Sequence, residues 1–354
     1  MTAASRGTRS TINVARVDVI TMQFDWMVQC YPGVGVHRDA PLLERLDRET
    51  TMEGVDAVEA AGLEGLWAPD HFMLGPRKEE YEVWTLLGAL AERTDDIDLG
   101  PLVGSVTYRN PALLAKMVTT VDILSEGRVR LGLGAGWHDE EHAAYGFDFP
   151  DTQTRIEMLD ESLHVAKSMF TENEPTFHGE HFQIEDAYNE PRPVQDPHPP
   201  ITIGGAGPKL LRVAAKHADE WNVEISSRAR GPSIEYKAEK FDEYLEAEGR
   251  DPDEVERSSL HHILVRQDQA TIDEYCDRIF PLPWGEESDM DEQLSNAEEA
   301  REKGDFLIGT PAEVIEQIEE IRALSFEKLQ LMFLDFPDTG GIELFGDEVL
   351  PELS

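Results

Sequence analysis

An α/β protein built as one (β/α)8 barrel is the fold class that the sequence predicts. Strand-like and helix-like segments alternate along the chain, about eight of each, which is the number that such a barrel needs. The clearest unit lies between Ile97 and Leu133, where two short apolar strands flank a helix-length segment from Pro111 to Ser125. Chemistry in parallel β/α proteins gathers at the carboxyl ends of the strands, so candidate functional residues are expected there.

The individual elements follow from local apolar runs and from end signals. The predicted strands are residues 17–22, 65–68, 97–103, 129–133, 201–203, 220–225, 260–265 and 328–334. The predicted helices are residues 42–61, 81–93, 111–125, 155–170, 208–217, 233–249, 311–321 and 342–349. Gly62 is typical of a helix C-cap, and Thr310 and Glu313 form a capping box around Pro311.

One domain is expected to account for most of the chain. We predict a disordered tail at residues 1–13 and a single barrel domain at residues 14–354. Residues 267–305 are acidic and are predicted to be an irregular insertion before the last barrel helix. The polar start is unlike a secretory signal and no run of about 20 apolar residues occurs, so we expect a cytoplasmic protein without a membrane span.

The charge of the chain is strongly acidic. Asp and Glu number 72 against 31 Lys and Arg, a formal net charge of −41. This charge would repel nucleic acid, so a nucleic-acid partner is excluded. The acidic residues are spread along the chain, which indicates either a solvated acidic surface or, as we favour, adaptation to a salt-rich cytoplasm. The Debye length is about 3 Å in 1 M salt, so self-repulsion is screened there.

A histidine follows the second predicted strand. His71 could donate a proton or hydrogen-bond a cofactor ring near neutral pH, and the alternative is a structural histidine that caps a loop. We expect the neighbouring Asp70 to orient the loop or His71. A separate H-x-x-E-H pattern begins at His138 and ends at His142, which would suit a zinc hydrolase. We disfavour that alternative because Gly146 ends any helix soon and no third ligand is evident.

Glycines follow two further strands. Gly134 and Gly136 would let a ligand approach the backbone. A dinucleotide fingerprint, G-x-G-x-x-G from Gly132, fails because Trp137 stands at its third glycine. Residues 204–207 open the helix that starts at Pro208, and free N–H groups at a helix N-terminus favour a phosphate. The alternative is a tight turn without a ligand.

Four segments carry a resemblance to a known family, and they occur in the order WAPDHF, GPLVGSVTYRNPALLAK, SEGRVRLGLGAGW and PPITIGGAGPKLLRVAAKHADEWN. Together they resemble the luciferase-like monooxygenase superfamily, specifically its branch that depends on the deazaflavin coenzyme F-420. The resemblance covers most of residues 17–349. It implies an oxidoreductase that transfers hydride between coenzyme F-420 and an unidentified small molecule, with FMN-dependent monooxygenation as the alternative. We expect a homodimer.

The resemblance also implies roles for single residues. It places His71 at the reacting centre, with Asp70 beside it, and it predicts a cis peptide bond at Leu102–Val103 behind the cofactor ring. Trp137 stands where sugar-phosphate dehydrogenases of the superfamily carry a catalytic glutamate, which argues against that reaction. The predicted cofactor-binding residues lie at strand ends and are Leu102, Val103, Gly104, Gly134, Gly136, Trp137, Gly204, Gly205, Ala206 and Gly207. No metal site is expected.

Overall fold

The computed structural model describes residues 22–28, 47–74, 78–224, 232–280, 296–303 and 306–353. The predicted tail at residues 1–13, most of the predicted first strand and the predicted start of the first helix at Leu42 lie outside these residues. No helix within the described ranges is long and apolar enough to cross a membrane.

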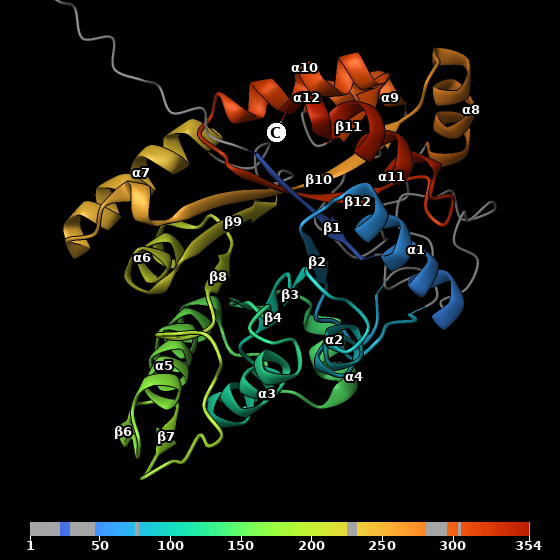
Figure 1. Cartoon of the computed structure of the whole chain (residues 1–354). Helices are drawn as coiled ribbons and strands as arrows, with labels where there is room; N and C mark the ends of the chain where they lie inside the picture. Colours follow the sequence, from blue (N-terminus) through green and yellow to red (C-terminus); the bar gives the residue numbers. More distant parts are fainter. Residues whose placement is uncertain are drawn as a thin grey trace, which may run out of the picture.

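A parallel sheet closes on itself at the centre of the molecule (Figure 1). Its strand order is β3-β2-β1-β12-β10-β9-β8-β5-β4, and a parallel bridge between Leu99 and Val129 joins the two ends. The strands are β1 Gln23–Met27, β2 Gly65–Ala68, β3 Asp98–Pro101, β4 Gly104–Ser105, β5 Leu131–Gly134, β8 Ile201–Gly204, β9 Glu220–Glu224, β10 Glu256–Val265 and β12 Lys328–Phe333. Because β3 and β4 are two parts of one barrel strand, the predicted (β/α)8 barrel is confirmed.

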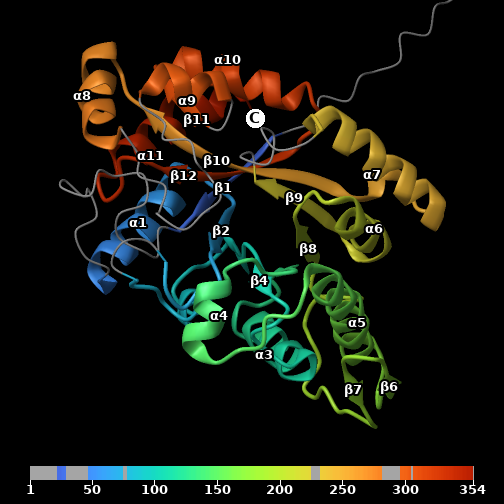
Figure 2. The same cartoon turned by 180° about the vertical axis from the view of Figure 1, so that it is seen from behind.

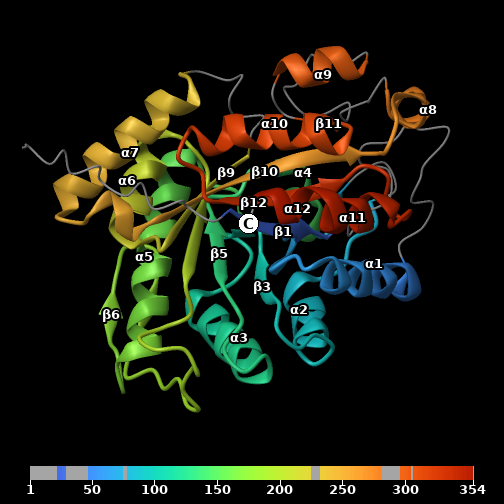
Figure 3. The same cartoon turned by 45° about the horizontal axis from the view of Figure 1, so that its top comes forward.

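Helices surround this sheet and bury its outer face, as Figure 3 shows. They are α1 Arg48–Ala61, α2 Val83–Ala91, α3 Pro111–Leu124, α5 Thr152–Thr171, α6 Pro208–His217, α7 Ile234–Glu248, α10 Pro311–Arg322, α11 Gly340–Leu344 and α12 Leu350–Leu353, with the short helices η2 Pro252–Glu254 and η3 Phe345–Val349. The predicted end signals are confirmed: Gly62 caps α1 with φ +80°, and Thr310 and Glu313 form the capping box of α10.

The prediction that residues 267–305 are irregular is wrong for their described part. Helices α8 (Gln269–Ile279) and α9 (Ala297–Lys303) form there, and an additional strand, β11 (Phe306–Gly309), follows and pairs with β10. Apolar residues at helical spacing, Ile272, Cys276 and Ile279, pack with strand residues in a second buried cluster. The acidic composition therefore describes the exposed faces of these helices and says nothing against helix formation.

Two smaller elements were also not predicted. Helix α4 (Asp139–Tyr145) follows β5 and ends at Gly146, which caps it with φ +75° (Figure 2). Strands β6 (Phe177–His178) and β7 (Gln183–Ile184) form a hairpin in the connection between α5 and β8.

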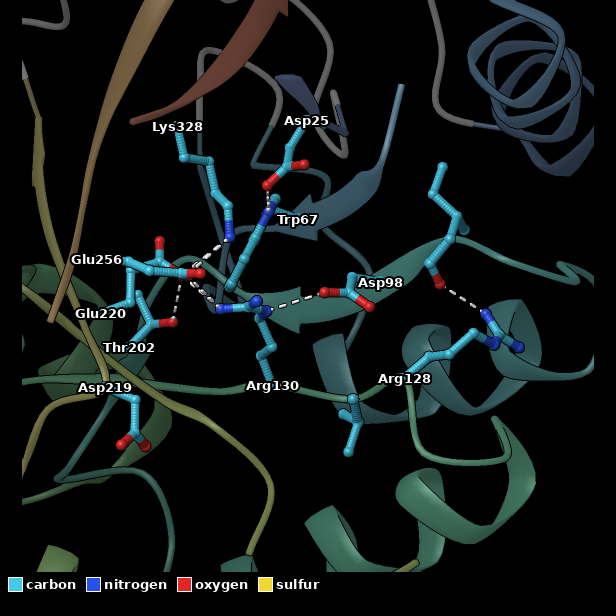
Figure 4. Close-up of polar contacts among 12 residues, drawn as sticks. Asp25, Trp67, Asp98, Arg128, Arg130, Thr202, Asp219, Glu220, Glu256 and Lys328 are labelled. Carbon is cyan, nitrogen blue, oxygen red and sulfur yellow. Dashed lines mark hydrogen bonds and ion pairs between the residues drawn. The ribbon is translucent and has the colours of Figure 1, made fainter. Parts of the chain in front are cut away.

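Polar and charged side chains gather at the amino ends of the barrel strands, and Glu220 and Lys328 among them are buried (Figure 4). Arg130 donates hydrogen bonds to Asp98, Glu220 and Glu256 at 2.9–3.0 Å, and Lys328 reaches Glu256 at 3.1 Å. These residues come from the amino ends of β3, β5, β9, β10 and β12. Since each charge has an opposite partner, the burial of Glu220 and Lys328 in this network is compatible with a stable barrel.

Candidate active site at the carboxyl ends of the barrel strands

Above the polar network, the barrel interior becomes apolar. Side chains alternate along a strand, so Asp25 and Met27 share the inner face of β1, and Lys328, Gln330 and Met332 share that of β12. Met27 and Met332 pack with other residues of this upper layer in a separate buried cluster. Its buried members are Met27, Trp67, Leu102 and Met332, and Val103 and Leu260 pack against it while staying partly exposed. This layer is an apolar floor beneath the carboxyl ends of the strands.

The peptide bond Leu102–Val103 is cis, as the resemblance predicts, and it separates β3 from β4. The Val103 side chain points toward the neighbouring strands: a Cβ atom on Gly134 would lie 2.9 Å from Val103 Cγ2, and one on Gly204 would lie 2.7 Å from it. These two glycines therefore make room for Val103. Gly136 has φ +74°, and a Cβ atom there would lie 2.2 Å from Ser105 Oγ.

Asp70 lies at the end of β2 and is almost fully buried. Its carboxylate binds the Arg109 guanidinium at both oxygens, at 2.6 and 2.9 Å, and accepts the backbone N–H of Ser105 at 3.3 Å. Arg109 also donates to Glu82 at 2.6 Å. Asp70 thus joins the loop after β2 to β4 and to the turn before α3. That Asp70 orients this loop or His71 stays a prediction; the hydrogen bonds found for its carboxylate among the described residues come from Arg109 and Ser105.

The carboxylate that contacts His71 is Glu141 of helix α4. His71 Nδ1 lies 2.8 Å from Glu141 Oε2, and the Glu141 side chain is fully buried while that of His71 is 14% exposed. Tyr108 donates its hydroxyl to the same oxygen, and the backbone N–H groups of Phe72 and Met73 donate to Oε1. Sequence reasoning missed Glu141 as a site residue because it noted this position only as part of the H-x-x-E-H pattern.

The electrostatics of this cluster favour an ionised Glu141. Burial raises its pKa, but the hydrogen bond and charge of His71, together with hydrogen bonds from Tyr108 and Phe72, outweigh burial and hold the pKa at about 2. Burial and the Glu141 carboxylate raise the pKa of Tyr108, which stays a neutral donor. Burial and the charges of Glu141 and Asp70 raise the pKa of Glu80 to about 10, so Glu80 stays protonated near neutral pH. Glu141 therefore remains an anionic carboxylate at this end of the barrel.

The two histidines of the H-x-x-E-H pattern, His138 and His142, have structural partners. His142 is fully buried, with Nε2 at 2.6 Å from Thr107 Oγ1 and Nδ1 at 2.6 Å from the His138 carbonyl oxygen. His138 Nδ1 accepts the backbone N–H of Glu141 at 3.0 Å and so caps α4. Among the described residues no group of three potential ligands could hold a metal ion. Both ring nitrogens of His142 are engaged, which argues against the zinc hydrolase.

Trp137 is 61% exposed and lies against the site histidine. Its ring meets the His71 ring edge-on, with centroids 5.4 Å apart, and it also contacts His138. Trp26 and Trp84, in contrast, are buried in the main core, and Trp284 lies outside the described residues.

The loop after β8 leads into α6. Gly205 has φ +127°, a conformation that a residue with a side chain rarely adopts, and it places Ala206 and Gly207 at the start of the helix. Gly207 is the N-cap of α6 and supplies no side-chain hydrogen bond, whereas Asp47, Asn110 and Asp151 cap α1, α3 and α5 with theirs. A Cβ atom on Gly207 would meet nothing within 4 Å. This helix N-terminus could hold an anion.

Curated relatives of the chain include enzymes with two different cofactors. The F420-dependent glucose-6-phosphate dehydrogenase of Amycolatopsis mediterranei is 30% identical over 197 residues, which are 53% of this chain and 59% of that protein. The chain thus matches less than two thirds of that relative's length. The FMNH(2)-dependent dimethylsulfone monooxygenase of Pseudomonas putida is 25% identical over 263 residues, 68% of this chain and 70% of that protein.

Solved structures with the same fold include a dehydrogenase and a monooxygenase. An F420-dependent secondary alcohol dehydrogenase, solved with an F420-acetone adduct, gives a TM-score of 0.72 at 20% identity and covers 94% of this chain and 99% of its own. Monooxygenase RslO1 from Streptomyces bottropensis gives 0.76 at 19% identity, covering 94% and 100%. The family model for luciferase-like monooxygenases matches residues 22–328, and the chain belongs to this family.

Proposed function

We propose that this protein is an oxidoreductase that transfers hydride between the deazaflavin coenzyme F-420 and a small organic substrate. The observation that carries the proposal is the position of His71. The His71 ring, at the end of β2, is held by Glu141. The adjacent Asp70 accepts the backbone N–H of Ser105, just beyond the cis bond Leu102–Val103. A titratable ring and an apolar floor thus lie at the same, carboxyl end of the barrel.

The residues present suit a flat, tricyclic ring with a phosphate tail. Leu102, Val103 and Leu260 offer an apolar surface, of which Val103 and Leu260 stay partly exposed. The N-terminus of α6, which lacks a side-chain cap, would receive the phosphate on its free N–H groups. A deazaflavin supplies hydride transfer when bound, because it has carbon where a flavin has nitrogen.

The chain's own part in the reaction is proton movement and orientation. His71 Nδ1 is occupied by Glu141, so the other ring nitrogen, Nε2, is the atom that would take a proton from a substrate hydroxyl or return it to a carbonyl. Asp70 and Arg109 hold the backbone beside it. Trp137, exposed beside His71, would form a wall of the substrate site.

The substrate is proposed to differ from a sugar phosphate. In the sugar-phosphate dehydrogenases that the sequence resembles, a catalytic glutamate occupies the position of Trp137, and an indole cannot transfer a proton as a carboxyl can. Those enzymes also carry a tryptophan at the position of Gly75, which lies outside the described residues. The chain offers no carboxylate at position 137 for that chemistry.

An FMN-dependent monooxygenase is the second candidate, since the Pseudomonas putida relative uses FMNH(2). The two are separated by measuring oxidation of reduced F-420 and of reduced FMN, with and without oxygen, in the presence of a panel of small carbonyl compounds. Hydride transfer predicts that reduced F-420 is oxidised without oxygen when an acceptor is present. Turnover of reduced FMN that requires oxygen, with none of F-420, would establish the monooxygenase instead.

We also propose that the chain works in a salt-rich cytoplasm and forms a homodimer. The support for the first is the net charge of −41. Molar salt shortens the Debye length to about 3 Å, which removes most of the repulsion between surface carboxylates.

A further inference from the structure

We propose that Glu141 is the positioning residue of the site and that it fixes the neutral His71 ring as the Nδ1–H tautomer, which leaves Nε2 unprotonated. The inference deepens the proposed function and rests on it for its catalytic meaning. Its structural basis is the 2.8 Å contact between His71 Nδ1 and Glu141 Oε2, made by two side chains that are 14% and 0% exposed.

The four partners of Glu141 decide which atom of this contact carries the hydrogen. The backbone N–H groups of Phe72 and Met73 can only donate, and both bind Oε1. The Tyr108 hydroxyl and His71 Nδ1 share Oε2. A carboxylate has about four acceptor positions, so four donors saturate it. With the pKa of Glu141 at about 2, the carboxyl carries no hydrogen near neutral pH, and the hydrogen in this contact belongs to His71 Nδ1.

Two aromatic neighbours fix the plane of the ring. Trp137 and His138 meet the His71 ring edge-on, with centroid distances of 5.4 and 5.8 Å. Both follow β5 directly, and His138 also caps the helix that carries Glu141. The tautomer and the orientation of His71 are therefore set by the same short segment, residues 137–141. In consequence Nε2 is a proton acceptor while the ring is neutral and a donor after it takes a proton.

Replacing Glu141 by Gln should give the His71 ring the opposite tautomer. The backbone N–H groups of Phe72 and Met73 still need an acceptor, so they hold the amide oxygen at the position of Oε1. The amide NH2 then faces His71 Nδ1 and donates to it. Nδ1 loses its hydrogen and the ring becomes the Nε2–H tautomer, with the acceptor atom turned away from the reaction.

The test is ring nitrogen NMR on the whole protein without cofactor, labelled with ¹⁵N in its histidine rings, at a pH where histidine is neutral. The spectrum contains 11 histidines, and the His71 signals are assigned by their loss in His71→Gln. We expect wild-type His71 to show the Nδ1–H form and Glu141→Gln to show the Nε2–H form. Tyr108→Phe removes another donor to Oε2 and should keep the wild-type tautomer, as should Glu140→Gln, which makes the same charge change at an exposed neighbour.

A catalytic readout accompanies the spectrum. Glu141→Gln should lower kcat at least about tenfold with reduced F-420 while the Kd for F-420 stays unchanged, since a carboxylate that fixes a catalytic histidine's tautomer can contribute up to ~10⁴ in kcat. Wild-type His71 in the Nε2–H form overturns the proposal, and so does an unchanged tautomer in folded Glu141→Gln. If the tautomers behave as expected but wild type does not oxidise reduced F-420, the positioning role stands and the proposed function fails.

Discussion

Asp70 and Glu141 lie at the same end of the barrel but act on different groups, and the sequence could predict only one of these roles. The neighbour of His71 in the chain, Asp70, is an evident candidate partner, and it instead binds Arg109 and the Ser105 backbone. Glu141 is 70 residues away from His71. Only the folded arrangement of β2 and α4 brings the two together, so no spacing rule within one element could have found this contact.

Removing the charge of Asp70 should destabilise the fold. Among the described residues, Asp70→Asn leaves the buried Arg109 with the partly exposed Glu82 as its one charged partner. Breaking a buried ion pair costs about 3–5 kcal/mol, and we expect roughly 2–4 kcal/mol because Glu82 remains. Urea unfolding of the variant measures this loss.

The matched control is Glu140→Gln, which breaks an exposed pair with Lys78 and should cost about 0–1 kcal/mol. Equal losses in the two variants would show that the Asp70–Arg109 pair does not hold the loop after β2.

At the scale of elements, local signals predicted most barrel helices because each has its own apolar face and caps. Helix α6 was predicted with the observed bounds, since Pro208 suits its first turn. Helix α4 was not predicted, because seven residues give too little periodicity and its cap is the unusual His138. Strand β11 was hidden by the acidic segment before it. The cis bond at Leu102–Val103 followed from the resemblance alone, because nothing in the local residue types requires it.

The N-terminus of α6 can be tested at a position that tolerates a side chain. Gly205 is unsuitable, because its φ of +127° and the nearby Leu210 would strain any replacement. Gly207→Asp introduces a favourable N-cap in open space, so the fold should be unchanged or slightly stabilised. The same carboxylate would compete with a phosphate for the helix N–H groups and repel it. We expect the Kd for F-420 to rise at least about tenfold, which corresponds to ~1.4 kcal/mol.

Gly207→Asn is the control for charge, because it also caps the helix but carries no charge. It should weaken F-420 binding less than Gly207→Asp does. If Gly207→Asp binds F-420 as tightly as wild type, the phosphate does not lie at this helix.

The interior of the barrel predicts a pH effect on stability. Burial raises the pKa of Asp25 from 3.8 to about 7, against the opposing effects of Lys328 and the Trp67 hydrogen bond. The folded state thus binds this proton more tightly than the unfolded state, so wild type loses stability as the pH rises from about 4 to about 7. Asn at position 25 can still accept the Trp67 N–H but does not titrate.

The free energy of unfolding of Asp25→Asn, relative to wild type, should therefore increase from about pH 5 to about pH 8. Urea unfolding at the two pH values measures it. Asp335 and Glu80, whose pKa values burial also raises, are present in both proteins and cancel in the comparison. A difference that stays constant between pH 5 and pH 8 would mean that Asp25 is already ionised in the folded state at pH 5, paired with Lys328.

At the scale of the whole molecule, the net charge of −41 predicts strong dependence on salt. Self-repulsion in dilute buffer should be screened by about 1 M KCl, so the Tm should rise steeply with salt. Osmolytes that are excluded from the protein surface also strengthen apolar burial. The comparison is therefore with an uncharged osmolyte at a concentration that raises the Tm of a neutral protein as much as KCl does. If charge screening is the cause, KCl must raise the Tm of this chain well beyond that osmolyte. A flat Tm in KCl, or equal stabilisation by the osmolyte, would refute adaptation to a salt-rich cytoplasm.

The family, the fold and the arrangement of the site are compatible with two cofactors, and direct binding distinguishes them. Spectral titration of the purified protein with F-420 and with FMN, both in KCl, gives the two dissociation constants without any knowledge of the substrate. We expect F-420 to bind more tightly than FMN. The motifs around His71, the cis bond Leu102–Val103 and the α6 N-terminus resemble those of the deazaflavin branch. Equal affinity, or tighter binding of FMN, would contradict the assignment of this protein to deazaflavin chemistry.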